Sequence, residues 1–126
     1  MKSLLRSLVP MAHVADVVRS AEFYMKLGFK VGSTFTPKGA ESLTWAWLES
    51  EGGAKLMVTQ ADEPVDPEQQ AVLFYIYCDD IVAKREELVA ANIKASPMAF
   101  PFHSPRGEFR IEDPDGYVIM MTHTDA

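Results

Sequence analysis

Two pairs of aromatic residues, each pair spaced two positions apart, have the chemistry to bind an organic molecule. Trp45 and Trp47 lie in the stretch TWAWLES, and Tyr75 and Tyr77 lie in the stretch LFYIYC. Alternate side chains of a β-strand point to the same face, so each pair places two rings side by side. Flat rings of this kind suit planar or extended ligands. The alternative is that the rings pack in the core or at a subunit interface, because alternating aromatic residues are common in strands.

Charged and apolar residues alternate over residues 108–112, which read EFRIE. The apolar residues of this stretch suit the core, so Glu108, Arg110 and Glu112 are expected to point to the opposite face. A carboxylate on such a face can bind a cation or act as a general base. Alternatively, Arg110 forms a structural ion pair with one of the two glutamates.

The histidines and the single cysteine are not expected to form a catalytic or metal-binding set. His103 lies in a loop bracketed by prolines and is expected to be exposed. His13 and His123 lie near strand ends and differ in the face to which they point. Cys78 has no partner for an internal disulfide and is expected to behave as a small buried apolar residue. No nucleophile with a neighbouring base is evident, so no catalytic residue is assigned.

Composition and charge limit the classes of function. The 126 residues are 48% hydrophobic and 24% charged, which predicts one compact globular domain. A net charge of −6 argues against binding to nucleic acid or to an anionic membrane, and is compatible with a cationic ligand. No apolar run approaches the roughly 18 residues of a membrane span. Because Arg6 and Pro10 break up the N-terminal stretch, a signal peptide is not expected, and the chain is predicted to be cytoplasmic.

The first half of the chain is expected to form a βαβββ module. A strand over residues 4–12 precedes a helix over residues 17–27, which Asp16 caps and Gly28 ends. Three further strands are predicted over residues 29–35, 43–49 and 55–60. The acidic stretch that follows, over residues 61–68, contains two prolines and reads as a connector.

The second half repeats this plan. A strand over 72–78 leads to Asp80, a helix over 81–91 and Asn92 as the left-handed residue that ends it. A strand over 93–95, a loop over 96–105 and a hairpin with strands over 108–112 and 117–121 complete the chain. The spacing between the residues that begin and end the helix is the same in both halves: Asp16 to Gly28 in the first, and Asp80 to Asn92 in the second. We therefore expect a single domain, 1–126, made of two βαβββ modules at about 1–61 and 70–126.

Two motifs give this plan a family resemblance. The first consists of Val14-Ala15-Asp16 with Ser20, Phe23-Tyr24 and Leu27-Gly28-Phe29; the second is the tight turn Asp113-Pro114-Asp115-Gly116. Together with the strand–Asp–helix of the second half, they make the chain resemble the vicinal oxygen chelate superfamily of glyoxalases, bleomycin resistance proteins and ring-cleaving dioxygenases. The resemblance implies an α+β fold in which two βαβββ modules form a cupped mixed sheet, with helices on its outer face. It does not imply one activity, because the fold hosts several chemistries.

The resemblance also locates the positions at which metal-binding members place His, Glu or Gln. Here these positions carry Val9, Met57, Leu73 and Met120, none of which offers a hard oxygen or an imidazole nitrogen. No metal and no cofactor are therefore expected. Activities of the glyoxalase I, extradiol dioxygenase and metal-dependent fosfomycin transferase types are not expected either.

Residues in step with these positions are expected to line the cavity of the cup. The pattern resembles bleomycin resistance proteins, which sequester a drug in a groove between two chains and have lost the metal site; Arg106-Gly107-Glu108-Phe109 also looks like a run in their equivalent strand. The resemblance implies a homodimer that binds an aromatic or cationic molecule, such as a glycopeptide antibiotic, without metal. The predicted ligand-binding residues are Trp45, Trp47, Met57, Tyr75, Tyr77, Glu108, Arg110 and Met120.

A metal-independent enzyme is the alternative. In that reading the chain is an isomerase or lyase that uses Glu108, Tyr75 or Arg110 as acid–base or charge-stabilising groups. The absence of a recognisable nucleophile–base pair favours the binding protein. A ligand that stays chemically unchanged after long incubation would separate the two hypotheses.

Overall fold

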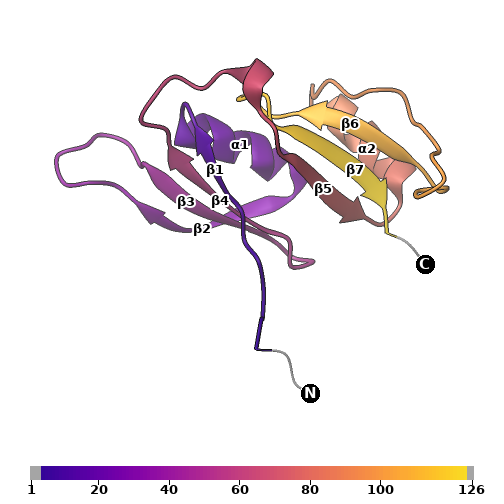
Figure 1. Cartoon of the computed structure of the whole chain (residues 1–126), viewed down its shortest axis with the longest axis horizontal. Coiled ribbons are helices and arrows are strands. Elements are labelled where there is room, and N and C mark those ends of the chain that lie inside the picture. The colour runs from indigo at the N-terminus through magenta and orange to yellow at the C-terminus, as the bar shows by residue number, and fades with distance from the viewer. Residues whose placement is uncertain (1–3, 125–126) are drawn as a thin grey trace. The chain divides into compact units, whose positions relative to one another are not determined.

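The computed structural model describes residues 4–124, and the chain divides into two compact units, Met1–Pro64 and Val65–Ala126. Each unit contains one mixed β-sheet and one α-helix (Figure 1). The predicted α+β class and the pair of strand–helix modules are confirmed, with one hydrogen-bonded sheet in each unit. Within the described residues, no helix is long and apolar enough to cross a membrane.

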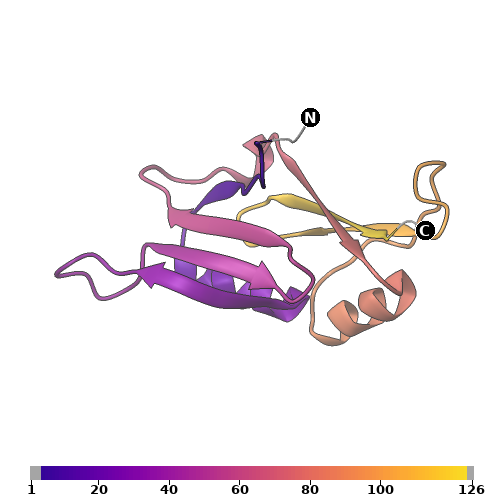
Figure 2. The ribbon, with the colours of Figure 1, turned by 90° about the horizontal axis from the view of Figure 1, so that it is seen from below.

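The first unit contains a four-stranded sheet with the strand order β1-β4-β3-β2. Strand β1 is parallel to β4, and the other neighbours are antiparallel. Figure 2 shows the helix α1 covering one face of this sheet. The elements are β1 (Met11–Val14), α1 (Val17–Leu27), β2 (Phe29–Phe35), β3 (Trp45–Ser50) and β4 (Lys55–Gln60).

Helix α1 begins and ends where its capping residues predict. The Asp16 side chain accepts a hydrogen bond from the Arg19 backbone N–H at 3.1 Å, and Gly28 adopts φ 117°, which favours glycine. The buried stripe includes Val17 and Tyr24, and the Tyr24 ring lies edge-on to Phe29 at 5.7 Å. This stripe packs on the buried side chains of β3 and β4, namely Ala46, Leu48, Leu56 and Val58.

The second unit contains a three-stranded sheet with the strand order β5-β7-β6, in which β5 is parallel to β7 and β6 is antiparallel to it. Its core includes Ile81 and Leu88 of the helix and Phe109, Ile119 and Met121 of the sheet. Asp80 caps the helix by accepting from the Ala83 backbone N–H, and Asn92 follows it with φ 66°. The elements are η1 (Pro67–Gln69), β5 (Leu73–Cys78), α2 (Ile81–Ala90), β6 (Glu108–Glu112) and β7 (Val118–His123).

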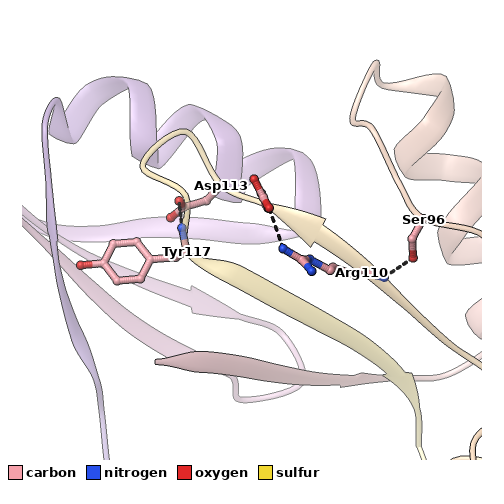
Figure 3. A network of polar contacts seen from close by, with 5 residues as sticks. Ser96, Arg110, Asp113 and Tyr117 are labelled. Atoms are coloured by element: carbon pink, nitrogen blue, oxygen red, sulfur yellow. Dashed lines mark hydrogen bonds and ion pairs between the residues drawn. The ribbon is translucent and has the colours of Figure 1, made fainter. Parts of the chain in front are cut away.

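The tight turn between β6 and β7 is held by Asp113. Its buried carboxylate accepts hydrogen bonds from the backbone N–H groups of Asp115 and Tyr117, each at 2.9 Å. Figure 3 shows the bond from Tyr117. Gly116 closes the turn at φ 85°, and a Cβ there would lie 2.5 Å from Pro67 Cβ. The turn therefore forms as predicted, and it requires glycine for two reasons: its backbone conformation and the close approach of Pro67.

The predicted strand over residues 4–12 is wrong, because the first strand begins at Met11. In the parallel register Met11 lies opposite Met57, so residues before Val9 extend beyond the start of β4 at Lys55. The preceding Pro10 contributes only its carbonyl, which accepts from the Met57 backbone N–H. Leu4 and Leu8 are consequently 93% and 91% exposed.

The predicted strand over residues 93–95 is also wrong. The chain pairs with β6 slightly later, through the Ser96 backbone N–H to the Arg110 carbonyl and through two hydrogen bonds between Ala99 and Glu108. Pro97 has no N–H, and the Ser96 hydroxyl replaces a carbonyl as the acceptor from the Arg110 N–H, so a regular ladder does not form. This segment nevertheless runs beside β6 as β2 runs beside β3. The remaining differences are shifts of one or two residues at the ends of α2, β3, β5 and β7.

Candidate functional site

One face of the first sheet, opposite α1, carries the predicted aromatic and thioether residues of the first unit. Strand register places Trp47 beside Met57, and Met57 beside Met11. Trp45 lies in the neighbouring row, between Phe35 and Thr59. We call this the aromatic face; its residues are Met11, Phe35, Trp45, Trp47, Met57 and Thr59, all partly or fully exposed.

Trp47 is held in position by two neighbours. Its indole Nε1–H donates a hydrogen bond to Glu49 Oε1 at 3.0 Å. On β2, a Cβ at Gly32 would lie 3.1 Å from Trp47 Cδ1, so the absence of a side chain there makes room for the indole. The ring is thus a fixed, half-buried platform with its polar edge already satisfied.

The equivalent face of the second sheet combines tyrosines with charged residues. The register across β5, β7 and β6 gives three rows of side chains on this face, which we call the mixed face. The rows are Leu73–Val118–Glu112, Tyr75–Met120–Arg110 and Tyr77–Thr122–Glu108. The expected alternation along β5 is present, with exposed Tyr75 and Tyr77 between half-buried residues.

Arg110 forms an ion pair along its own strand. Its guanidinium donates to Glu112 Oε1 at 2.8 Å, and its backbone N–H donates to the Ser96 hydroxyl (Figure 3). Both charged side chains are exposed, so the pair contributes about 0–1 kcal/mol to stability. The structural ion pair that the sequence left open is therefore present, and its partner is Glu112.

Glu108 differs from the other charged residues of the mixed face because it is buried. The residue is 7% exposed, and its Oε1 has no hydrogen-bond partner among the described residues. The imidazole Nε2 of His103 lies 3.4 Å from that oxygen. Sequence reasoning expected His103 to be merely exposed and missed this proximity; the only signal was the proline-bracketed loop that precedes β6.

Cys78 lies on the face of β5 away from the tyrosines, and it is half-buried. Burial raises the pKa of its thiol; Lys84 opposes this effect, whereas Asp79 and Asp80 add to it. The thiol lies 3.8 Å from the Thr122 carbonyl oxygen. These surroundings are those of an unactivated cysteine rather than a nucleophile.

Metal-ligating residue types are not gathered at one place in the part of the chain that the structure describes. Within residues 4–124, no three side chains of the His, Cys, Asp and Glu types converge in a group suited to a metal ion. Of the four positions matched to metal ligands, Val9 lies before β1, whereas Met57, Leu73 and Met120 lie on the two sheets. None of these side chains offers an oxygen or imidazole donor.

The predicted site residues fall into two sets. Trp45, Trp47 and Met57 share the aromatic face of the first unit. The second set shares the mixed face of the second unit and comprises Tyr75, Tyr77, Glu108, Arg110 and Met120. Their assignment as ligand-binding residues stays a prediction.

Residues 9–121 match the family model of the Glyoxalase/Bleomycin resistance protein/Dioxygenase superfamily. No curated protein sequence is significantly similar to the chain.

Several solved structures are similar in fold. A bleomycin resistance determinant encoded on the transposon Tn5 is 17% identical, with a TM-score of 0.77 over 97% of this chain and 100% of that one. TnmS3, an antibiotic-binding protein from Streptomyces sp. CB03234, is 17% identical, with a TM-score of 0.76 over 99% and 100%. A bleomycin-binding protein from Streptomyces verticillus, complexed with copper(II)-bleomycin, is 20% identical, with a TM-score of 0.72 over 99% and 100%. At these identities the likeness establishes the fold.

Proposed function

The chain belongs to the Glyoxalase/Bleomycin resistance protein/Dioxygenase superfamily, and we propose that it is a metal-independent protein that binds and sequesters an aromatic or cationic small molecule. A glycopeptide antibiotic is one ligand of this class. The aromatic face of the first unit and the mixed face of the second each carry residues that the sequence predicts to contact such a ligand. The fold neighbours that bind antibiotics support this class of function.

The observation that carries the proposal is the chemistry of the two faces. In each unit, the sheet face opposite the packed core presents aromatic or thioether side chains instead of the usual small polar ones. Stacking on such rings contributes roughly 0.5–1.5 kcal/mol for each good ring contact, and a desolvated cation adds about 0.5–2 kcal/mol. An acidic chain with net charge −6 favours encounter with a cation.

Titration of tryptophan fluorescence tests the proposal. Both tryptophans lie on the aromatic face, so their emission reports on that surface. We expect bleomycin or a planar cation such as proflavine to change the emission saturably and to be recovered chemically unchanged after long incubation. Conversion of the ligand would instead support a metal-independent isomerase or lyase, for which the buried Glu108 is the group to substitute first.

Binding is proposed to need no metal, because the positions matched to metal ligands are apolar. Affinity for the ligand should be the same before and after treatment with a strong chelator. A stoichiometric metal in untagged protein, whose removal abolishes binding, would contradict this part of the proposal.

The protein is also proposed to form a homodimer. Leu4 and Leu8, which precede β1, are almost fully exposed, and β5 is an edge strand of its sheet with exposed Leu73, Tyr75 and Tyr77. Exposed apolar side chains and open strand edges favour association with a second copy.

A further inference from the structure

A loop over residues 99–107 lies beside the row Tyr77–Thr122–Glu108 of the mixed face. Ala99 and Glu108 exchange two backbone hydrogen bonds, at 2.8 and 2.9 Å, where the loop begins and ends. Two turns shape it, from the Ser104 N–H to the Pro101 carbonyl and from the Gly107 N–H to the Ser104 carbonyl. The loop is therefore anchored at both ends on β6.

The hydroxyl groups of Ser104 and Thr122, which lie at this loop, are hydrogen-bonded to each other. Ser104 Oγ is bonded to the Gly107 carbonyl at 2.9 Å and to Thr122 Oγ1. A carbonyl oxygen only accepts, so the single Ser104 proton goes to Gly107 and Thr122 donates its proton to Ser104. Thr122 is the register partner of Glu108, yet it has no proton left for the carboxylate.

The Glu108 carboxylate consequently receives no hydrogen bond from Thr122. Its side chain is more than nine-tenths buried and its Oε1 accepts no hydrogen bond from any of residues 4–124, although a buried carboxylate oxygen normally has a donor. His103 Nε2, at 3.4 Å, is the nearby group that carries a positive charge when protonated, and the His103 side chain is 48% exposed. An imidazole so exposed can swing away without opening the core of the unit.

We infer that Glu108 is the anchor for one primary ammonium group of the ligand, and that His103 occupies this place only while no ligand is bound. The inference rests on the proposed function and narrows its ligand class to planar aromatic molecules that carry an amine on a short arm. A compact ammonium suits a single vacant oxygen, whereas a planar guanidinium needs two carboxylate oxygens for its paired hydrogen bonds. Tyr77, in the same row and 64% exposed, supplies a ring for the aromatic part.

The test compares two probes on the full-length protein: 9-(aminomethyl)anthracene and its N-acetyl derivative, which keeps the ring and loses the charge. Wild-type protein should bind the amine at least about tenfold more tightly, since a hydrogen bond to a charged group is then made only by the amine. Glu108→Gln should abolish this preference while still binding the acetyl derivative. Glu112→Gln is the matched control, because Glu112 is an exposed carboxylate on the same strand and face, and it should leave the preference intact.

His103→Ala separates the two roles within the pair. If His103 only occupies the ammonium position, the variant should bind the amine as tightly as wild-type protein or more tightly. Equal binding of both probes by wild-type protein overturns the inference and leaves the proposed function standing. A loss of amine binding in His103→Ala as large as that in Glu108→Gln also overturns it. Failure of both probes to bind wild-type protein overturns the proposed function itself. The wild-type comparison decides the matter even if Glu108→Gln does not fold.

Discussion

Trp47 illustrates how a single residue can be tested for two roles. Its indole is fixed by Glu49 and by the space above Gly32, but the ring remains half-exposed on the aromatic face. Trp47→Ala should therefore weaken binding of a planar aromatic cation about tenfold or more, because it removes a stacking surface. Trp45→Ala should act in the same direction. Each variant loses one of the two tryptophans whose emission reports binding, so calorimetric titration is the measurement.

Thermal melts on the same variants provide the contrast. Leu48 follows the two tryptophans in sequence but is fully buried beneath the sheet, and Leu48→Ala should cost about 2–5 kcal/mol of stability. The tryptophan variants should melt much closer to wild-type protein than Leu48→Ala does. If they melt as early as Leu48→Ala and bind the cation unchanged, the two rings belong to the core and not to a binding surface.

Cys78 gives a second prediction for a single residue. Because burial raises the pKa of its thiol, the reactive thiolate is scarcer at any pH below that pKa than in an unfolded chain. Alkylation by iodoacetamide at pH 8 should be markedly slower in the native protein than in urea, and the native rate should keep rising at pH values where the unfolded rate has levelled off. A native rate equal to or above the unfolded rate would show an activated cysteine instead.

Side-chain direction was predictable from the sequence, whereas the partner of Glu108 was not. The period of two along a strand is local, so the alternation of Tyr75 and Tyr77 with their half-buried neighbours follows from the sequence. The approach of His103 to Glu108 depends on the path of residues 99–107. Hydrogen bonds of Ser104 to Gly107 and to Thr122 set this path, and Thr122 is distant in the sequence. No local pattern encodes such contacts.

The turn between β6 and β7 is an element in which one glycine meets two requirements, and two substitutions can separate them. Gly116→Ala should cost about 2–5 kcal/mol of stability, from left-handed backbone strain together with a clash against Pro67. Gly39 has nearly the same φ, 87°, but nothing lies within 4 Å of the place that a Cβ would occupy there, so Gly39→Ala should cost only about 1–2 kcal/mol. Urea denaturation measures both values. Equal losses would mean that Pro67 moves aside freely.

Elements with strong end signals were predicted well. Asp16 and Gly28 bound α1 at the expected residues, and β2, β4 and β6 have the expected limits, because caps and turns act over a few residues. The two wrong strands share one cause. Residues 4–9 and 93–95 have strand-like composition, but a strand also needs a partner in register. One segment runs past the start of β4, and the other ends before the chain reaches β6 at Ser96, where Pro97 then breaks the ladder.

On the scale of the whole molecule, the duplication places different chemistry at equivalent positions. Met57 and Met120 occupy matching places in the two sheets, each between neighbours on the same face. In the next row, Trp45 lies opposite Thr59 in one unit, and Glu108 lies opposite Thr122 in the other. The repeat thus supplies two similar frameworks, of which the first carries an indole and the second a carboxylate at the equivalent position.

Association with a second copy is the prediction that belongs to the whole molecule. A homodimer of this chain should bury an interface of standard area, about 1,200–2,000 Å² or more, and should persist at micromolar concentration. Light scattering should then give twice the chain mass of 14.0 kDa.

Replacing both Leu4 and Leu8 with Asp should shift the mass toward one chain, because charges at these positions oppose their burial. Val82→Asp is the matched control, because Val82 is an exposed apolar residue of α2, and it should not change the mass. A wild-type mass of one chain at micromolar concentration would contradict the dimer; a dimer that survives the double substitution would place the interface away from residues 4–9, at the open edges of β2 or β5.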